Sequence, residues 1–364
     1  MKNTFGNHVA VTLFGESHQE EIGVVIDGLT PGMKIDEEFI KKQLDRRRPS
    51  GKISTARKEK DEFRIVSGVF KGRATGTPLC ILIPNQNVSS KDYEKTKHLL
   101  RPSHADYAAF CKYHGFQDYR GGGHFSGRLT APIVAAGAIA MDALAKKGIL
   151  IGTHVKQCAG VSDRGFEQME EDIQRLKSMN FAVLDEEKAK KMKERMEEAG
   201  AEGDSVGGVL ETVILNIPKG VGEPWFDSFE SMIAHGLFSI PAVKGVEFGL
   251  GYGFADKKGS EVNDAFAMED EKVVTCTNYN GGINGGITNG MPVTFTCVIK
   301  PTPSIYKEQK TVDLKKKENT TISIEGRHDP AIVHRAGVVV EAMTALTVMD
   351  QLCGRFGNQY FAED

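Results

Sequence analysis

The chain has 364 residues, of which 40% are hydrophobic and 26% charged, a composition typical of a soluble globular protein with a sizeable core. Its formal net charge of -3 and pI near 6.4 argue against binding to nucleic acid or to an anionic membrane. The N-terminus lacks a secretory leader and no stretch of about 18 apolar residues is apparent, so we expect a cytoplasmic location.

The first half of the chain mixes short strands with loops and helices. Strands are predicted at 5–13, 22–26, 63–70 and 77–83. Helices are predicted at 36–48, 107–115 and 131–147. Asp36 is a suitable N-cap for the first of these helices, and Pro49 ends it. A polar loop at 14–20 separates the first two strands, and a glycine-rich loop at 120–128 leads directly into the apolar third helix.

The second half begins with the most polar part of the chain, residues 163–204. It contains a charged helix at 186–199 with little apolar face, which we expect to be exposed and peripheral. Strands follow at 209–217 and 292–300, and helices at 227–237 and 332–352. Because strands and helices do not alternate regularly, we predict an α+β fold with antiparallel sheets. The length allows two domains or one large domain over residues 1–364.

Two histidines lie beside small polar residues in predicted loops: His18 follows Ser17, and His104 lies in the sequence Arg-Pro-Ser-His-Ala-Asp. An imidazole titrates near neutral pH and can act as a general acid, although a histidine that is hydrogen-bonded for structural reasons fits the same pattern. Adjacent residues of an extended loop point in different directions, so Ser17 and His18 do not form a nucleophile and base.

Arginines are frequent in the predicted loops and at the helix ends: Arg46, Arg47, Arg48, Arg57, Arg101, Arg120, Arg128, Arg327 and Arg335. Guanidinium groups bind carboxylate and phosphate bidentately, so a converging set fits a small polyanion. Solvated surface charge is the alternative interpretation for any one of them.

Glycine makes up 40 of the 364 residues, against a usual share of roughly 7%. Two glycine-rich loops, at 120–128 and 280–286, offer backbone N–H groups to a phosphate or to the edge of a flat cofactor. The loop at 120–128 has the spacing of neither a Walker A loop nor a dinucleotide fingerprint, and tight turns are the alternative for both loops. Six cysteines without a C-x-x-C pair predict reduced thiols, and we expect no metal.

Taken in chain order, these segments resemble the chorismate synthase family. The matching segments are 15–31, 46–49, 55–59, 67–72, 75–78, 101–106, 118–123, 242–247, 281–287, 300–305 and 326–330. The similarity covers about residues 5–352, and the ordered series is far more specific than any single motif.

The resemblance implies a β-α-β sandwich, with helices between two four-stranded antiparallel sheets, assembled as a homotetramer. It implies a lyase that forms chorismate and phosphate from 5-enolpyruvylshikimate 3-phosphate by anti-1,4-elimination, the last step of the shikimate pathway in aromatic amino acid biosynthesis. This family needs reduced FMN, which lends electron density as phosphate leaves and recovers it as hydrogen leaves C6. Bifunctional members reduce the flavin with NADPH; without an added domain here, we expect an external flavin reductase.

The resemblance also implies residue roles. His18 matches the histidine that protonates the leaving phosphate, His104 the one that protonates the flavin near N1, and Asp329 the aspartate that acts through flavin N5. Substrate binding is expected of Arg46, Arg47, Arg48, Arg101, Arg128 and Arg335. Flavin contacts carry over to His124, Phe125, Ser126, Pro241, Ala242, Gly285, Lys300, Pro301, Thr302, Pro303, Ser304 and Arg327. Nicotinamide contacts carry over to Arg47 and Lys52.

Some positions depart from the family pattern. Gln19 and Pro241 replace a usual glycine and asparagine, and the stretch 123–128 differs from the common Gly-Arg-Ser-Ser-Ala-Arg. Residues 50–52, Ser-Gly-Lys, also differ from the Pro-Gly continuation that is common in the family. Two alternative functions stay open at this point: a flavin-dependent reductase, which would oxidise nicotinamide instead of forming chorismate, and a polyanion-binding scaffold, which would need no flavin.

Overall fold

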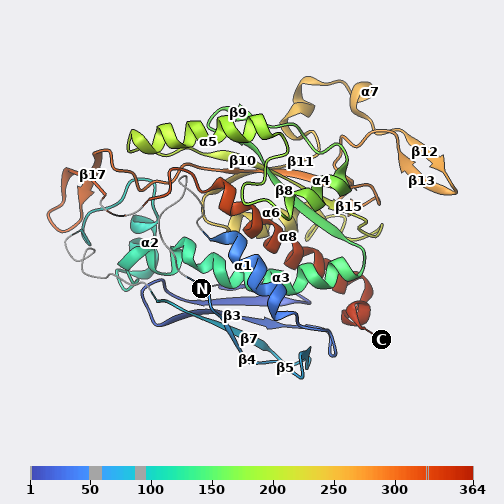
Figure 1. The fold of residues 1–364 in the computed structure, drawn as a ribbon, viewed down its shortest axis with the longest axis horizontal. Helices are drawn as coiled ribbons and strands as arrows, with labels where there is room; N and C mark the ends of the chain where they lie inside the picture. The colour runs from blue at the N-terminus through green and yellow to red at the C-terminus, as the bar shows by residue number, and fades with distance from the viewer. Residues whose placement is uncertain (1, 49–59, 87–95, 325, 327, 364) are drawn as a thin grey trace.

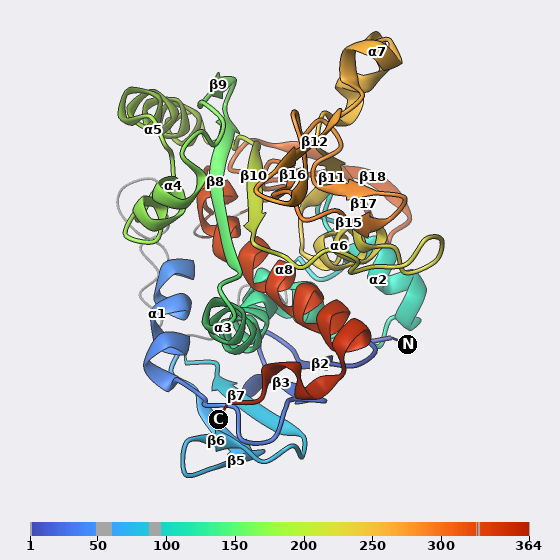
Figure 2. The same cartoon turned by 90° about the vertical axis from the view of Figure 1, so that its right-hand side faces the viewer.

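Two antiparallel sheets enclose a layer of helices in the computed structural model (Figure 1). The structure describes residues 2–48, 60–86, 96–324, 326 and 328–363. Figure 1 shows one sheet below the helices and the other above them, and the turned view in Figure 2 shows the same three layers. One apolar core runs through all three layers.

The first sheet comes from the N-terminal part of the chain. Its strands, in spatial order, are β1 (Thr4–Phe5), β2 (Ala10–Gly15), β3 (Glu21–Asp27), β7 (Leu79–Pro84) and β4 (Arg64–Ser67), all paired antiparallel. Alternate residues of β7, namely Leu79, Ile81 and Ile83, are fully buried, as expected for a sheet with one covered face. The strand predicted at 5–13 is in fact two strands, because Gly6 turns the chain with a φ of 97°.

The second sheet is built mainly from the C-terminal half. Its spatial order is β11 (Val243–Phe248), β16 (Val293–Ile299), β10 (Gly208–Leu215), β8 (Leu150–Cys158) and β9 (Val161–Ser162), again all antiparallel. Each sheet thus has four longer strands and one edge strand of two residues, β1 or β9. The predicted α+β sandwich is confirmed, with a short edge strand added to each four-stranded sheet.

The helical layer consists of α1 (Glu37–Arg47), α3 (Thr130–Lys146), α6 (Phe229–Ser239) and α8 (Val333–Phe356). α3 packs on β3 and β7, and α8 packs on β8 and β10. The two helices approach so closely that a Cβ atom on Gly137 would lie 2.4 Å from Cβ of Ala342. The small residues of α3 therefore allow a tightly packed middle layer, as their sequence indicates. Asp36 caps α1 as predicted, accepting a 2.9 Å hydrogen bond from the backbone N–H of Phe39.

Two helical segments, Gly127–Lys146 and Val333–Phe356, are long and apolar enough to cross a membrane by length and composition. No such stretch was expected from the sequence. Both lie mostly buried between the sheets, 72% and 83% of the apolar window respectively, so both are core helices.

The polar segment 163–204 lies at the edge of the second sheet (Figures 1 and 2). It contains α4 (Met169–Leu176), which packs on β8, and α5 (Glu186–Ala201), which contacts β9. The charged α5 is peripheral, yet it has a narrow apolar face, because Met192 and Met196 are fully buried. This narrow face agrees with the prediction of a charged helix with little apolar face.

A buried histidine connects this segment to the sheet. His154 on β8 lies with Nδ1 3.0 Å from Oδ2 of Asp163 and Nε2 2.7 Å from Oε2 of Glu211. Asp163 also accepts hydrogen bonds from the backbone N–H groups of Leu184 (2.6 Å) and Asp185 (3.0 Å). Burial alone would lower the pKa of His154, but the two carboxylates outweigh it and raise that pKa.

The other elements lie around the sandwich. The helices are α2 (Asp106–Tyr113), α7 (Gly259–Val262) and the short 3-10 helices η2 (Arg120–Phe125), η3 (Gly127–Leu129), η4 (Gly251–Asp256) and η5 (Asn358–Phe361). The two-stranded pairs are β5–β6 (Val69–Phe70, Arg73–Ala74), β12–β13 (Phe266–Glu269, Lys272–Thr275), β14–β15 (Ile283–Asn284, Ile287–Thr288) and β17–β18 (Gln309–Asp313, Glu318–Ile322). The part that carries α7, β12 and β13 projects from the body in Figure 1.

Candidate active site

The glycine-rich loop at 120–128 lies between the two candidate catalytic histidines. It forms η2 and η3 and leads directly into α3, as predicted. A Cβ atom on Gly121 would lie 2.1 Å from Cε1 of His18, and one on Gly122 would lie 3.4 Å from Cε1 of His104. Both glycines have positive φ values, 60° and 101°. The loop backbone therefore contacts both imidazole rings, and only glycine permits the approach to His18.

The contacts of Ser17 fix the position of His18. The backbone N–H of Ser17 donates to the carbonyl of Gly123 at 3.2 Å, which fixes the His18 loop to the glycine loop. The expectation that the side chains of Ser17 and His18 point apart is wrong, since Oγ of Ser17 lies 3.2 Å from Nδ1 of His18. The same Oγ donates to the carbonyl of Arg120 at 3.4 Å. With its own proton directed to that carbonyl, the Ser17 hydroxyl is placed to accept a hydrogen bond from Nδ1 of His18.

Gln19, which replaces the usual glycine beside His18, forms a side-chain hydrogen bond. Nε2 of Gln19 donates to Oδ2 of Asp118 at 3.4 Å, and the same carboxylate binds Arg120 bidentately at 2.7 and 2.8 Å. Nδ2 of Asn85 donates to the carbonyls of Glu16 (3.0 Å) and Gln19 (2.8 Å). The loop of His18 is thus fastened at both ends.

His104 is oriented by a carboxylate and an arginine. Nδ1 of His104 lies 2.8 Å from Oδ1 of Asp106, and Asp106 accepts two further side-chain hydrogen bonds from Arg101 at 2.6 and 2.8 Å. Burial alone would raise the pKa of Asp106, but its hydrogen bonds with Arg101 and His104 hold that pKa well below the usual range. Asp106 is therefore ionised at neutral pH and can only accept hydrogen bonds, so Nδ1 of His104 carries the proton that it donates to Asp106.

Two candidate substrate arginines share one buried carboxylate, Asp61. Nε and Nη2 of Arg47 donate to Oδ2 of Asp61 at 3.2 and 2.5 Å, and Nη1 of Arg128 pairs with Oδ1. Arg47 also donates to the hydroxyl of Thr130 at 3.3 Å, and Nε of Arg128 donates to Oδ1 of Asn85 at 3.0 Å. Burial would raise the pKa of Asp61, but the two arginines outweigh it and lower that pKa.

Asp329 and Arg335 extend this cluster from the start of α8. Nη1 of Arg335 pairs with Oδ2 of Asp329, and Nε of Arg335 donates to the backbone carbonyl of Arg47 at 3.0 Å. We call Arg47, Asp61, Arg128, Asp329 and Arg335 the arginine cluster. Asn85 connects it to the His18 loop, so the structure brings most of the predicted catalytic and substrate residues into one network.

A second group of residues fits a phosphate-bearing cofactor. The backbone N–H of Lys300 donates to the carbonyl of Ala242 at 2.9 Å, and Ala242 has a φ of 75°, which is uncommon outside glycine. Nζ of Lys300 donates to the carbonyl (2.6 Å) and hydroxyl (2.8 Å) of Ser103, next to His104. Oγ1 of Thr302 is buried and has no hydrogen-bond partner in the described part of the chain. An ammonium group and an unpaired buried hydroxyl suit the phosphate and hydroxyl groups of FMN.

The predicted flavin residues at 124–126 are held by protein contacts. Nδ1 of His124 donates to the carbonyl of Gly15 at 2.8 Å, and Phe125 lies edge-on to Tyr113 with ring centroids 6.0 Å apart. The hydroxyl of Ser126 accepts from the backbone N–H of Arg128 at 3.3 Å. Contacts from this stretch to a cofactor would therefore come mainly from its backbone.

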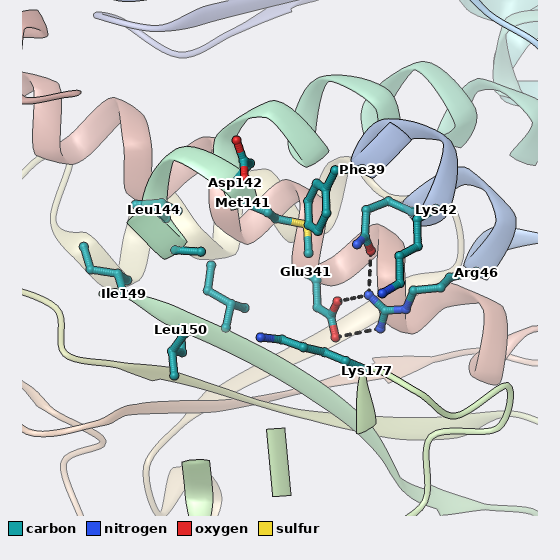
Figure 3. A pocket seen from close by; sticks show the side chains of 13 residues that line it. Phe39, Lys42, Arg46, Met141, Asp142, Leu144, Ile149, Leu150, Lys177 and Glu341 are labelled. Carbon is teal, nitrogen blue, oxygen red and sulfur yellow. Dashed lines mark hydrogen bonds and ion pairs between the residues drawn. The ribbon is translucent and has the colours of Figure 1, made fainter. Parts of the chain in front are cut away.

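Two further predicted substrate arginines pair outside the arginine cluster. Arg46 pairs with Glu341 at 2.6 Å (Figure 3), and Arg48 pairs with Asp45 at 2.8 Å. Gly285 and Gly286 both have positive φ values, 60° and 83°, and form the two-residue turn between β14 and β15. Lys52 and Arg327 lie outside the described residues.

Asp61, Asn85 and Asp106 were missed by reasoning from the sequence. Asp106 stands two residues after His104, a spacing that could have suggested a carboxylate–imidazole pair. Asp61 and Asn85 lie far from their partners in sequence and carry no local signal. All six cysteines are free, and burial raises the pKa of Cys297 to about 12. No group of three or more metal-ligating side chains occurs among the residues that the structure describes.

Comparison with known proteins identifies relatives along nearly the whole chain. The family model for chorismate synthase matches residues 9–353. Chorismate synthase from Pyrococcus abyssi is 49% identical over 350 residues, covering 96% of this chain and 97% of that one. Chorismate synthase from Thermococcus kodakarensis is 47% identical over 350 residues with the same coverage. A crystal structure of chorismate synthase superposes with a TM-score of 0.74 at 28% identity, covering 97% of this chain and 94% of that one.

Proposed function

This chain belongs to the chorismate synthase family, and on that premise we propose that it forms chorismate by eliminating phosphate from 5-enolpyruvylshikimate 3-phosphate. It is a carbon–oxygen lyase. One observation supports placing the reaction here: His18 and His104 flank one glycine loop whose last residue, Arg128, belongs to the arginine cluster.

The arginine cluster and Arg101 bind the substrate, which carries two carboxylates and a phosphate. A guanidinium group has five N–H donors, so Arg47 and Arg128, which share one carboxylate, keep donors for a ligand. Arg335 adds a third guanidinium at the same place. Arg46 stays outside the proposed substrate site, because Glu341 already binds it bidentately in another pocket.

His18 is the general acid. With Nδ1 held by Ser17, its Nε2 is the atom from which a proton passes to the departing phosphate oxygen. His104 holds its Nδ1 proton against ionised Asp106, so Nε2, 3.6 Å from the Cβ position of Gly122, is the nitrogen that exchanges a proton on the side of the glycine loop. Asp329 accepts the proton that leaves the substrate, with its carboxylate fixed by Arg335.

When bound, reduced FMN supplies the electron density that assists departure of phosphate. Lys300 and Thr302 would hold its phosphate and hydroxyl groups, together with the backbone at 124–126 and at Pro241 and Ala242. Pro301, Pro303, Ser304, Gly285 and Arg327 complete the proposed flavin contacts. The proposal includes NADPH, at Arg47 and Lys52, only if the protein reduces its own flavin.

The proposal also includes the cellular location of the enzyme, its oligomeric state and its source of reduced flavin. We place the enzyme in the cytoplasm as a homotetramer that receives reduced flavin from an external reductase. Residues 1–364 then form one functional domain, with 163–204 as a peripheral segment. Measuring NADPH oxidation by the purified protein in the presence of FMN tests whether an external reductase is needed.

The central test supplies the purified protein with 5-enolpyruvylshikimate 3-phosphate and photoreduced FMN under anaerobic conditions. We expect release of phosphate and formation of chorismate; no phosphate release would overturn the proposal. His18→Ala and Asp329→Ala should still bind flavin but turn over slower by roughly 10²-fold or more, the usual contribution of a positioned acid or base. A variant that keeps a near-normal rate disproves the role given to its residue.

A further inference from the structure

A pocket separate from the arginine cluster lies between α1, α3, α8 and the start of β8 (Figure 3). Its walls are mainly apolar, formed by Phe39, Met141, Leu144, Ile149 and Leu150. Its volume is about 110 Å³. It is smaller than a dry cavity of about 150 Å³, which is known to hold benzene, so it takes a short chain or part of a ring while the rest of the molecule extends through the opening.

Cationic side chains gather at one end of the pocket. Nη1 and Nη2 of Arg46 donate to the two oxygens of Glu341 at 2.6 and 3.1 Å, and Glu341, whose side chain is only 4% exposed, also accepts from the backbone N–H of Thr153 at 3.1 Å. Lys42 and Lys177 line the same pocket, and Figure 3 shows them flanking this ion pair.

The charges in this pocket are unbalanced. Three cations, Lys42, Arg46 and Lys177, face the two carboxylates of the lining, Glu341 and Asp142, which leaves one positive charge in excess. Asp142 pairs at 3.0 Å with Lys146, which also binds Glu363 at 2.8 Å. Within the described residues, Lys42 and Lys177 form no ion pair. A cation is therefore disfavoured as an occupant, and an anion is favoured.

We infer that this pocket binds a small organic monocarboxylate with an apolar body, such as an arylalkanoate. Its carboxylate lies between Lys42 and Lys177, beside the outer edge of Arg46. Its apolar part packs on Met141 and Leu144, where burial of carbon surface adds to the affinity. Inorganic phosphate, with no apolar part, gains only the electrostatic contact, and a neutral aromatic compound gains only the apolar one.

The test uses 3-phenylpropionate as the probe and its neutral amide, 3-phenylpropionamide, as the matched control, with binding measured by ligand-observed NMR on the full-length protein. We expect the acid to bind at least tenfold more tightly than the amide. The double variant Lys42→Glu/Lys177→Glu should lose this preference. The matched variant Lys190→Glu/Lys191→Glu, which changes the same charge on the exposed face of α5, should keep it.

Three results would overturn the inference: no binding of the acid, equal binding of acid and amide, or unchanged binding after the Lys42/Lys177 reversal. The last result would mean that the carboxylate occupies the arginine cluster instead. Because the test measures binding and not turnover, it succeeds or fails independently of the proposed lyase activity. Thermal unfolding of both double variants, compared with wild type, confirms that each is folded before the binding data are used.

Discussion

Replacing Asp61 with asparagine keeps the shape of the side chain and removes the negative charge that Arg47 and Arg128 share. The side chain of Asp61 is 1% exposed, and those of Arg47 and Arg128 are 10% and 6% exposed, so water screens the two guanidinium charges poorly. Breaking a buried ion pair by removing one partner costs about 3–5 kcal/mol, because an uncompensated charge stays buried. We expect D61N to lower the free energy of unfolding at neutral pH by about this amount.

The effect has a defined pH dependence. The two arginines hold the pKa of Asp61 below its usual value although burial opposes them. A group whose pKa is lowered by folding stabilises the protein fully above its unfolded pKa, about 3.9 for aspartate, and this contribution is lost as the pH falls through the folded pKa. The difference between wild type and D61N should therefore stay constant from neutral pH down to about 4 and shrink below it.

Urea unfolding across this pH range measures the effect. Glu198→Gln is the control, since it removes one partner of an exposed ion pair with Arg195 at 3.1 Å and should change stability by less than about 0.5 kcal/mol. Inorganic phosphate should stabilise D61N more than wild type, because an anion can take the place of the missing carboxylate. A loss below about 1 kcal/mol at neutral pH would refute the assignment of Asp61 as the shared anchor.

Further predictions concern the glycine loop, the buried histidine and the thiols. Gly121→Ala should lower turnover at least tenfold in the phosphate-release assay, because its Cβ would collide with the neighbouring imidazole; Gly148→Ala, with a similar φ of 77° and open space around it, should leave turnover unchanged. The carboxylates that flank His154 raise its pKa against the effect of burial, so its stabilising contribution is complete below the unfolded pKa of about 6.5 and is lost as the pH rises through the folded pKa. The stability gap between wild type and His154→Gln should accordingly narrow in alkaline solution, and a gap that widens there would contradict this. A thiol reagent should label exposed Cys111 and Cys276 quickly in the native protein and the three buried cysteines only after unfolding.

The run Arg46-Arg47-Arg48 shows where reasoning from the sequence ends. Successive residues of a helix point about 100° apart, so the side chains of three adjacent arginines face three different environments. Their partners lie at very different distances along the chain: Glu341 for Arg46, Asp61 for Arg47 and Asp45 for Arg48. The local sequence indicates an anion-binding run but cannot tell which member reaches the site, because two of the three partners are brought in by the fold.

More of the fold than of the site could be predicted from the sequence. The long helices α3 and α8 could be predicted from the length of their apolar runs, because both are buried on most sides, and β16 could be predicted from its alternation of buried and less buried residues. β8 has no alternating pattern, since five of its nine residues, including His154, are buried in a row, so periodicity did not indicate it. The hairpin β17–β18 is polar on both faces and carries no hydrophobic pattern at all.

The composition of the arginine cluster suggests why it can be buried and still bind a polyanion. Its three guanidinium groups face two carboxylates, those of Asp61 and Asp329, so one positive charge remains in excess. Three uncompensated cations would be too costly to bury, whereas full neutralisation would remove the attraction for a phosphate and two carboxylates. The carboxylates therefore hold the guanidinium groups in place without cancelling them. D61N removes the carboxylate that holds Arg47 and Arg128 in place and at the same time raises the excess positive charge of the cluster. If the carboxylates have both roles, D61N should bind phosphate more strongly and be less stable than wild type.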